Sequence, residues 1–234
     1  MTLVAAFRCS KGGIMLCADR EENDGYTRRE VDKIYKINLV PCQVFIAGAG
    51  LSGVIAKANA LIHEALAKAL SNGTDILNEH KNIIESSLCE LHKRYSANLK
   101  AGPLELLIII APLNERLPML YRTEQGMMVP EPYYAAYGTG KPLCDYFADR
   151  LYEYGKLDKD SMKVLAAFIL REAEKAASGV GMGADVQFIH EGEKYVHYLF
   201  SGVIKEIQEC IPSLGDSLWE HWKANVTIPS RLAG

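Results

Sequence analysis

Two pairs of consecutive helices, each lying between groups of strands, constrain the fold of this 234-residue chain most. Apolar residues recur at steps of three and four over residues 51–70 and again over 76–95, which predicts two helices in direct succession. The sequence predicts two further helices at about 141–154 and 159–177. Helix pairs between strands argue against alternating βαβ units, and they favour antiparallel sheets with helices packed outside.

Short apolar runs bounded by turn residues mark the expected strands. These runs cover residues 2–9, 14–19, 33–39, 43–48, 104–111, 118–123, 133–138, 185–190 and 195–200. The first two are predicted to form a hairpin through Gly12-Gly13, because glycine tolerates the positive φ of a tight turn. We expect one domain over residues 1–234, with a core at about 2–200 and a C-terminal extension at about 201–234.

The composition predicts a cytoplasmic globular protein. Hydrophobic residues make up 49% of the chain, which is enough for one large core, and a net charge of −3 gives no strong bias toward nucleic acid or anionic membranes. No apolar run reaches the roughly 20 residues of a membrane span, and the N-terminus lacks the pattern of a signal peptide. The six cysteines include no CxxC motif and the six histidines lack metal-ligand spacing, so we expect no metal or other cofactor.

Thr2 directly follows the initiator methionine. Removal of Met1 would place a hydroxyl group and a free α-amine on one residue. A threonine hydroxyl is a weak nucleophile until a base takes its proton, and the N-terminal amine, with an ordinary pKa of roughly 7.7–8, is such a base. A nearby lysine would favour the alkoxide, and an aspartate would hold that lysine charged. Asp19 and Lys33, at the borders of predicted strands, are the candidates for these two roles.

This set of residues resembles the N-terminal threonine hydrolases, and among them the β-type subunits of the proteasome. In that family a mature threonine begins the first strand, Ala-Asp closes the second, Lys-Ile or Lys-Val opens a later strand, and a glycine-rich turn follows the next. The corresponding motifs here are Thr2, Ala18-Asp19, Lys33-Ile34 and AGAG at 47–50. The resemblance covers about residues 2–200. It implies the α+β class and a four-layer αββα sandwich, in which helix pairs flank two stacked antiparallel sheets.

The resemblance also implies catalytic roles. Thr2 Oγ would attack a peptide carbonyl while its own amine takes the proton, and water would later release the acyl-enzyme. Lys33 with Asp19 would activate the hydroxyl, and the N–H of Gly48 would bind the oxyanion. The spacing between Asp19 and Lys33 is slightly shorter than is usual in the family, which predicts a shortened hairpin between them.

Other motifs match the family more loosely. In YGTGK at 137–141, Thr139 stands where a serine is usual, and in ASG at 177–179, Ser178 stands at the serine of the motif Asp-x-x-Ser-Gly. The resemblance gives both hydroxyls catalytic roles near the threonine amine. It further implies an apolar specificity pocket. The pocket residues would be Val31, Ile46 and Gly50.

One departure from the family pattern concerns charge. Lys175 occupies the aspartate position of the motif Asp-x-x-Ser-Gly. A cation beside the Thr2 amine would lower the pKa of that amine. Alternatively, the family arrangement is lost at this point. The sequence therefore leaves open whether the chain has full proteolytic activity.

Three alternatives to a threonine peptidase follow from the same residues. A related transferase would pass the acyl group to an amine, and a catalytically silent subunit would have a structural role in a ring. The stretch GAGLSG at 48–53 also matches the dinucleotide fingerprint GxGxxG. That fingerprint needs a helix that returns to a parallel strand, whereas the helix at 51–70 leads into a second helix.

The resemblance defines the expected partners. It implies peptide or unfolded-protein substrates and a homo-oligomeric ring, with other proteasome-like subunits or an ATPase regulator as further candidates. No nucleic acid or membrane partner is expected.

Overall fold

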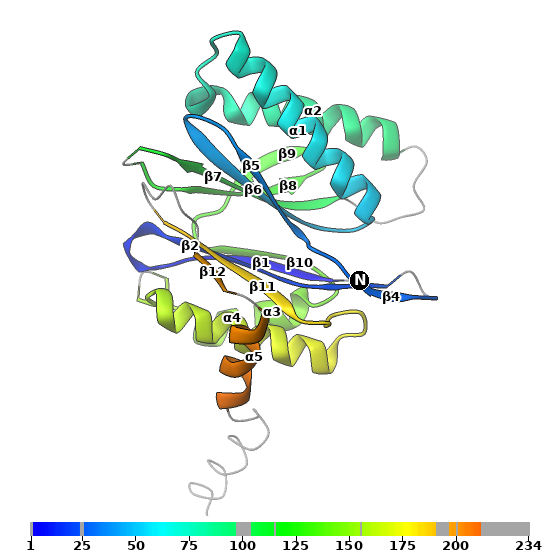
Figure 1. Ribbon diagram of the computed structural model, residues 1–234, viewed down its shortest axis with the longest axis vertical. Coiled ribbons are helices and arrows are strands. Elements are labelled where there is room, and N and C mark those ends of the chain that lie inside the picture. The colour runs from blue at the N-terminus through cyan, green and yellow to red at the C-terminus, as the bar shows by residue number, and fades with distance from the viewer. Residues whose placement is uncertain are drawn as a thin grey trace, which may run out of the picture.

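Four layers stack along the long axis of the molecule, as Figure 1 shows. The computed structural model describes residues 2–23, 26–96, 104–114, 116–154, 156–190, 197–199 and 201–211. One helix pair covers a five-stranded sheet, a second five-stranded sheet lies against the first, and another helix pair covers the far side. The predicted αββα sandwich is therefore confirmed.

The candidate nucleophile, Thr2, directly precedes an inner strand of the first sheet. The strands of this sheet are β1 (Leu3–Arg8), β2 (Ile14–Asp19), β10 (Tyr134–Gly138), β11 (Ala184–Ile189) and β12 (His197–Leu199). They lie in the order β10-β1-β2-β11-β12, and every neighbouring pair is antiparallel. A 3-10 turn, η1 (Ser10–Gly12), joins β1 to β2, and Gly12 has a φ of +80°, as the predicted glycine turn requires.

The second sheet runs in chain order. Its strands are β5 (Ile34–Asn38), β6 (Cys42–Ala49), β7 (Glu105–Pro112), β8 (Met119–Glu124) and β9 (Met127–Pro130), and all neighbours are antiparallel. The sequence analysis did not predict β9. Gln125 and Gly126 join it to β8 with φ values of 52° and 90°, the left-handed backbone of a two-residue hairpin turn. Because β6 has only antiparallel neighbours, the dinucleotide-binding context is absent there.

The four predicted helices are present, with ends that differ by a few residues. They are α1 (Ser52–Ser71), α2 (Ile76–Ser96), α3 (Lys141–Leu151) and α4 (Lys159–Ala176). Asp75 caps α2 by accepting a hydrogen bond of 3.1 Å from the N–H of Leu77. The C-terminal extension begins with a helix, α5 (Ser201–Cys210), which packs against α4 and β11. The extension beyond residue 211 lies outside the described residues. Of the expected strand at 195–200, residues 197–199 form β12, and the other three residues lie outside the described part of the chain.

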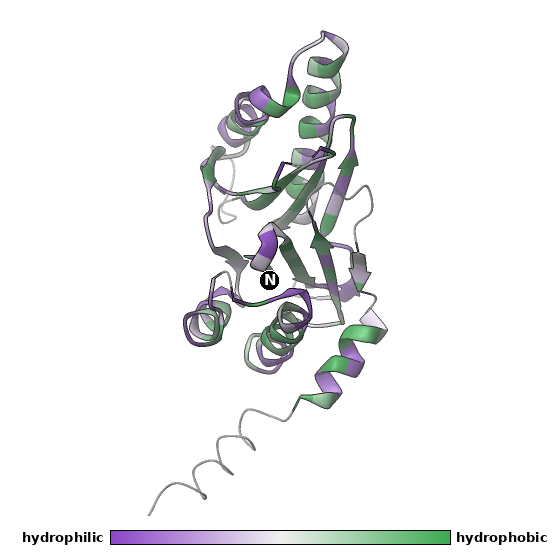
Figure 2. Ribbon diagram, turned by 90° about the vertical axis from the view of Figure 1, so that its left-hand side faces the viewer, coloured by the Kyte–Doolittle hydropathy of each residue, from purple (hydrophilic) through white to green (hydrophobic). Residues whose placement is uncertain are grey.

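The central strands are apolar on both faces because both faces are covered. In β1, Leu3, Ala5 and Phe7 pack toward α3 and α4, whereas Val4 and Ala6 pack between the two sheets. Figure 2 shows the resulting hydrophobic interior between polar outer helix faces. Continuous apolar runs such as β1 and β6 are thus explained by their position in a sandwich covered by helices. Among the helices that the structure describes, none combines the length and apolar character that crossing a membrane requires.

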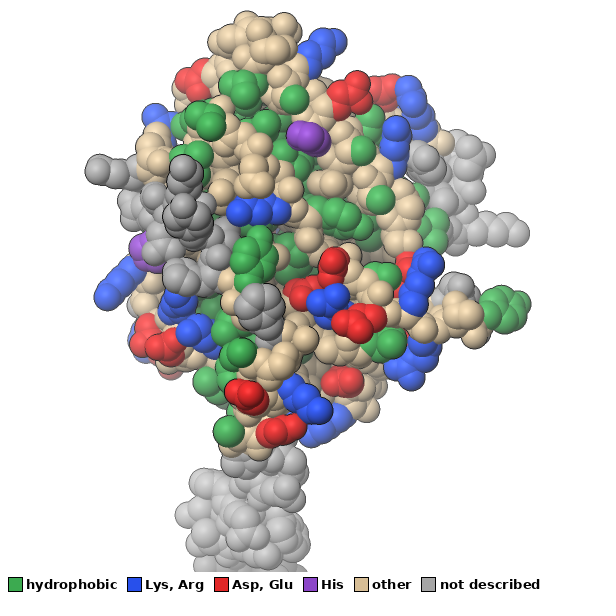
Figure 3. Space-filling model, in the orientation of Figure 1, with side chains coloured by type: hydrophobic (Ala, Val, Ile, Leu, Met, Phe, Trp, Pro, Cys, Tyr) green, Lys and Arg blue, Asp and Glu red, His purple; other side chains and the backbone are tan. Residues whose placement is uncertain are grey.

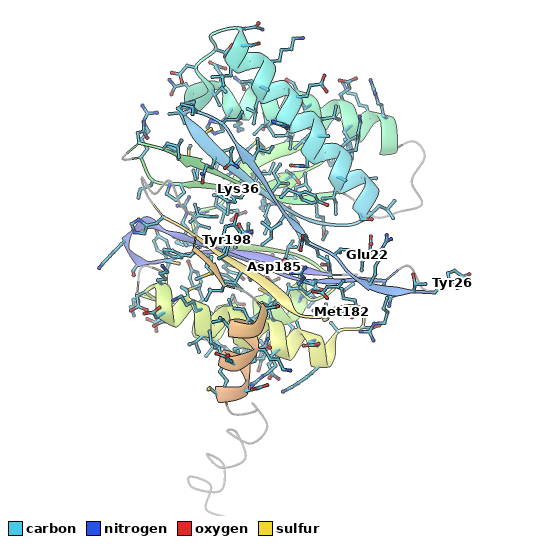
Figure 4. All side chains as sticks on the ribbon, in the orientation of Figure 1. Glu22, Tyr26, Lys36, Met182, Asp185 and Tyr198 are labelled. Carbon is cyan, nitrogen blue, oxygen red and sulfur yellow. The ribbon has the colours of Figure 1, made fainter. Side chains whose placement is uncertain are left out.

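A small hairpin connects the sheets. Its strands, β3 (Glu21–Asn23) and β4 (Arg28–Glu30), belong to neither large sheet and project from the body beside the N-terminus (Figure 1). Tyr26 lies near the tip, as Figure 4 shows. This residue is 98% exposed. A hairpin between Asp19 and Lys33 was predicted, and its presence is confirmed.

Protonation of one buried histidine should weaken the packing of α2 on the second sheet. His80 is 5% exposed, its Nδ1–H donates to the Leu77 carbonyl at 3.0 Å, and its Nε2 accepts from the Tyr121 hydroxyl at 2.9 Å. These partners fit the neutral ring, and burial lowers the pKa of His80 below its ordinary value of 6.5. Below pH 6.5 the histidine is therefore protonated more readily in the unfolded chain than in the folded one. The free energy of unfolding decreases as the pH is lowered.

We expect the wild-type protein to lose about 1 kcal/mol more than the His80→Gln variant between pH 7.5 and 5.5. Thermal unfolding at the two pH values measures this difference. His63→Gln, at an exposed position of α1, is the matched control and should follow the wild type. Equal pH dependence in wild type and His80→Gln would contradict the expectation.

Candidate active site

Thr2 lies at the start of β1 and is only 5% exposed. Strand β1 pairs with β2 so that Val4 lies opposite Ala18, and the beginning of β1 therefore adjoins the end of β2. Asp19 is the last residue of β2, and the Thr2 hydroxyl donates a hydrogen bond of 2.6 Å to its Oδ1 atom. The N–H of Leu3 donates to the same oxygen at 2.7 Å. The hairpin of β1 and β2 thus holds Thr2 against Asp19.

Lys33 reaches the same point from the second sheet, because it directly precedes β5. Its Nζ atom donates to Thr2 Oγ1, to Asp19 Oδ1 at 2.8 Å, and to the backbone oxygen of Glu21 at 2.5 Å. An ammonium group carries three hydrogens, so these three acceptors satisfy the charged form of the lysine. Burial lowers the pKa of Lys33, and the neighbouring charge of Asp19 opposes that change.

The carboxylate of Asp19 joins several elements and is 1% exposed. Its Oδ1 atom accepts the hydrogen bonds already described. Its Oδ2 atom accepts from the backbone N–H groups of Glu21 at 3.0 Å and Gly181 at 3.2 Å. Donors from β1, β3 and the loop before β11 therefore fix its position. Within the described part of the chain, no group of three His, Cys, Asp or Glu side chains is arranged to hold a metal ion.

The turn between β10 and α3 brings Thr139 to the backbone of Thr2. The Thr2 nitrogen donates to Thr139 Oγ1 at 3.3 Å, and the Thr139 hydroxyl donates to the Thr2 carbonyl at 3.3 Å. Gly138 has a φ of +94°, and a Cβ atom there would lie 2.2 Å from the backbone carbonyl oxygen of Thr2. The turn therefore needs glycine to approach this closely. Contact between Thr139 and the Thr2 nitrogen agrees with the role that the family resemblance implies.

A cavity of about 580 Å³ opens beside Thr2 between the two sheets and the β3–β4 hairpin. The predicted site residues that line it are Thr2, Val31, Lys33, Gly48 and Gly50. Gly48 lies near the end of β6, where a Cβ atom would meet Leu106 Cδ2 at 2.8 Å and Ile55 Cγ2 at 2.9 Å. Glycine at this position therefore follows from packing as well as from any role at the cavity.

The predicted specificity pocket needs two corrections. Ile46 is fully buried in the core between the second sheet and its helices, and it does not line the cavity. The cavity is also less apolar than expected, because Glu22, Arg29 and Asp32 line it together with apolar side chains. Glu22 forms an ion pair with Arg29, and hydrogen bonds from Ser52 and Arg29 lower the pKa of Glu22.

Ser178 also differs from the prediction. It is exposed and lines a separate cavity of about 280 Å³, which it shares with Lys175 and Arg28. Among the hydrogen bonds within the described residues, none joins Ser178 to Thr2. Lys175 is 52% exposed and forms an ion pair of 3.1 Å with Glu172 on the same helix. The structure thus leaves Ser178 and Lys175 outside the group formed by Thr2, Asp19 and Lys33.

Sequence reasoning missed two backbone contributors to the site. Glu21 supplies a carbonyl to Lys33 and an N–H to Asp19, and Gly181 supplies another N–H to Asp19. Backbone groups leave little trace in a sequence. The glycines of SGVGMG at 178–183 were a weak signal for the second contact, since Gly181 adopts a φ of +154° where its backbone meets the site.

A charged cluster fixes the base of the hairpin beside this site. Arg20 contacts Glu30 at 3.0 Å, Asp32 at 2.6 Å and Asp185 at 3.0 Å. Figure 3 shows acidic and basic side chains gathered in the middle of this face, where Figure 4 labels Asp185. The cluster therefore ties the segment from 20 to 32 to β11 of the first sheet.

Comparison with known proteins places the chain among its relatives. The sequence model of the proteasome subunit family matches residues 2–189. The chain belongs to the proteasome subunit family. Within this proteasome-like chain the match begins at Thr2 and ends with β11, so β12 and α5 lie beyond it. Among curated proteins, none matches the chain in sequence.

Solved structures with a similar fold include three structures of Anbu proteins from two organisms. Anbu from Yersinia bercovieri, described as an ancestral beta-subunit, has a TM-score of 0.74 at 15% identity, with 97% of this chain and 99% of that chain covered. Anbu from Hyphomicrobium sp. strain MC1 has a TM-score of 0.77 at 13% identity, with 97% and 99% covered. A Gly-1 mutant of the Hyphomicrobium protein gives 0.72 at 14% identity, with 98% and 100% covered. At these identities the likeness establishes the fold.

Proposed function

We propose that this proteasome-like chain is a threonine peptidase whose nucleophile is Thr2, exposed as the N-terminal residue by removal of Met1. The hydroxyl oxygen attacks a peptide carbonyl, and its proton passes to the α-amine, directly or through water. The tetrahedral intermediate expels the amine of the leaving peptide, which takes that proton, and an ester to Thr2 remains. Water then hydrolyses the ester and regenerates the hydroxyl.

The observation that carries the proposal is the contact of the Lys33 amine with the Thr2 hydroxyl oxygen and with Asp19. Three oxygen acceptors surround that amine, which suits an ammonium ion and leaves it without a lone pair to act as base. The positive charge instead favours the developing alkoxide. The role of general base then belongs to the α-amine of Thr2, whose nitrogen Thr139 contacts.

The cavity gives the reacting carbonyl a place to bind. Gly48 lines it at the end of β6, shortly before the N-terminus of α1. Backbone N–H groups and the positive end of a helix dipole both favour an oxyanion, which supports the proposed role of the Gly48 N–H. Charged and apolar groups together line this cavity, so we expect peptides with mixed side chains to bind rather than strictly apolar ones.

A peptide epoxyketone tests the proposal, because it reacts with a hydroxyl and an amine on the same residue. Protein with a free Thr2 amine should form one adduct, which peptide mass mapping should place on Thr2. The absence of both adduct formation and cleavage across a broad peptide panel would exclude a peptidase and leave a structural subunit. Added amines that appear in the products would indicate an acyltransferase instead.

Lys175→Asp should leave peptide hydrolysis unchanged within about twofold, or raise it. Lys175 is half-exposed and pairs only across one helical turn with Glu172, a contact that contributes little to stability. The measurement is kcat/KM for a peptide substrate with the fold checked by circular dichroism. A loss beyond tenfold, about 1.4 kcal/mol of barrier, would assign the lysine a catalytic role.

We further propose that the chain self-associates, as proteasome subunits form rings. The apolar face of α1 is buried inside the monomer through residues such as Val54, Ile62 and Leu66. A contact through α1 would therefore use its outer residues, such as Lys57 and Glu64. Light scattering should give a mass well above the 25.9 kDa of one chain at micromolar concentration. A stable monomer there would contradict self-association.

A further inference from the structure

Glu21 is a buried residue whose backbone contacts both Asp19 and Lys33. Its side chain has no exposed surface, although a charged group is costly to bury without a partner. Arg28 provides that partner across the β3–β4 hairpin: its Nε atom donates to Glu21 Oε1 at 2.8 Å, and its Nη2 atom donates to Oε2. These contacts lower the pKa of Glu21 and keep it charged. The exposed Arg28 thus covers the buried carboxylate.

The backbone of the same residue holds both charged members of the site. The N–H of Glu21 donates to Asp19 Oδ2 at 3.0 Å, and its carbonyl accepts from Lys33 Nζ at 2.5 Å. A movement of this one peptide segment would therefore shift the ammonium group and its counter-ion together. Short two-stranded hairpins are only marginally stable in water, so the β3 backbone depends on side-chain contacts for its position.

A second carboxylate, that of Glu174 on α4, lies near this ion pair. A Cβ atom on Gly181 would lie 3.0 Å from Glu174 Oε1 and 3.2 Å from Glu21 Oε2, so both acidic side chains approach the same glycine. The charge of Glu174 favours the Arg28 guanidinium. Arg28 therefore lies where its charge can neutralise acidic groups from both the hairpin and α4.

We propose that the Glu21–Arg28 ion pair is a positioning device that holds the β3 backbone so that the Glu21 carbonyl keeps the Lys33 ammonium group against Thr2. The effect on catalysis rests on the proposed function, but the effect on Lys33 does not. The ion pair acts on Lys33 through the Glu21 carbonyl and through the nearby charge of the Glu21 carboxylate, and neither side chain needs to touch a reacting atom. Without Arg28, the buried Glu21 carboxylate would turn toward solvent and draw its carbonyl away from Lys33.

The Arg28→Ala variant separates positioning from simple charge effects. Removing a distant cation, with the structure unchanged, would raise the pKa of Lys33. Loss of the Glu21 carbonyl as an acceptor and outward movement of its carboxylate would lower that pKa instead. The other acidic groups that favour the ammonium form, Asp19 and Glu22, remain in both cases. A raised pKa of Lys33 in Arg28→Ala would therefore indicate a charge effect alone, and a lowered pKa would indicate movement of the Glu21 backbone.

The experiment measures the titration of Lys33 by NMR of the intact protein with carbon-labelled lysine, assigned with Lys33→Met. We expect the pKa of Lys33 to fall by about half a unit or more in Arg28→Ala and to recover partly in Arg28→Lys. The control variant Arg94→Ala removes a similarly exposed arginine from an ion pair on α2. It should leave the pKa of Lys33 unchanged. Arg28 is 63% exposed, and Arg20 holds the hairpin base separately, so the fold should persist in these variants.

Peptide hydrolysis provides the second readout. We expect kcat to fall about 10- to 100-fold in Arg28→Ala, because the change displaces the Lys33 ammonium group from Thr2. A raised or unchanged pKa of Lys33 in Arg28→Ala would contradict the proposal that the ion pair positions Lys33, regardless of the hydrolysis rate. A lowered pKa in a protein whose wild type neither cleaves peptides nor reacts with the epoxyketone would support positioning and reject the peptidase.

Discussion

The Thr2→Ala variant should lose peptide hydrolysis by about ten-thousand-fold or more, because no other group replaces a covalent nucleophile. It should also form no epoxyketone adduct. Its stability should change by only about 1 kcal/mol, since the substitution removes one hydroxyl at the end of a strand while Asp19 keeps the hydrogen bond from Leu3. Steady-state kinetics, intact mass and thermal unfolding measure the three quantities.

Thr2→Ser is the matched control, because it keeps both the hydroxyl and the amine. It should form the adduct and retain measurable hydrolysis. If Thr2→Ala cleaves peptides as fast as the wild type after removal of Met1, then the activity comes from another group or from a contaminant. The large effect expected for Thr2 therefore gives the most direct test of the proposed nucleophile.

The fold could be predicted because strong local patterns agree with the packing. The helix pair 51–70 and 76–95 shows the helical period over many turns, and it forms α1 and α2. The strands of the interior are continuous apolar runs, which identifies them as buried on both faces. β9 was missed because its four residues include Pro130, and because its turn uses Gln-Gly in place of a strong Asn-Gly signal.

The site could be predicted best where a side chain provides the chemistry or where a glycine motif marks the backbone, as at Gly48. Thr2, Asp19 and Lys33 lie at strand borders, and antiparallel pairing brings those borders together. The contribution of Glu21 comes from its backbone, so its residue type gave no signal. Ser178 was assigned by motif alone, and the loop at 177–183 directs it to the other cavity while Gly181 contacts Asp19.

The Asp19→Asn variant should be the most destabilised of the site variants. Asp19 accepts from Lys33 and two other donors at Oδ1, and from two backbone N–H groups at Oδ2. In an asparagine, an NH₂ group would replace either Oδ1 or Oδ2 and would face hydrogen-bond donors. Lys33 would also lose its counter-ion while remaining buried. Breaking a buried ion pair by removing one partner costs about 3–5 kcal/mol. For a chain of this size, the unfolding temperature should fall by roughly 6–20 °C.

Replacing Lys33 in the same protein should recover part of that loss. In Asp19→Asn/Lys33→Met no unpaired charge remains between the sheets, so the double variant should be about 1–3 kcal/mol more stable than the sum of the single changes predicts. Both the single and the double variants should be inactive, because Thr2 lacks the ammonium group or the anion that holds it. Additive losses in unfolding experiments would mean that Asp19 acts through its backbone donors alone. Recovered stability without recovered activity would separate the cost of burying Lys33 from its use in catalysis.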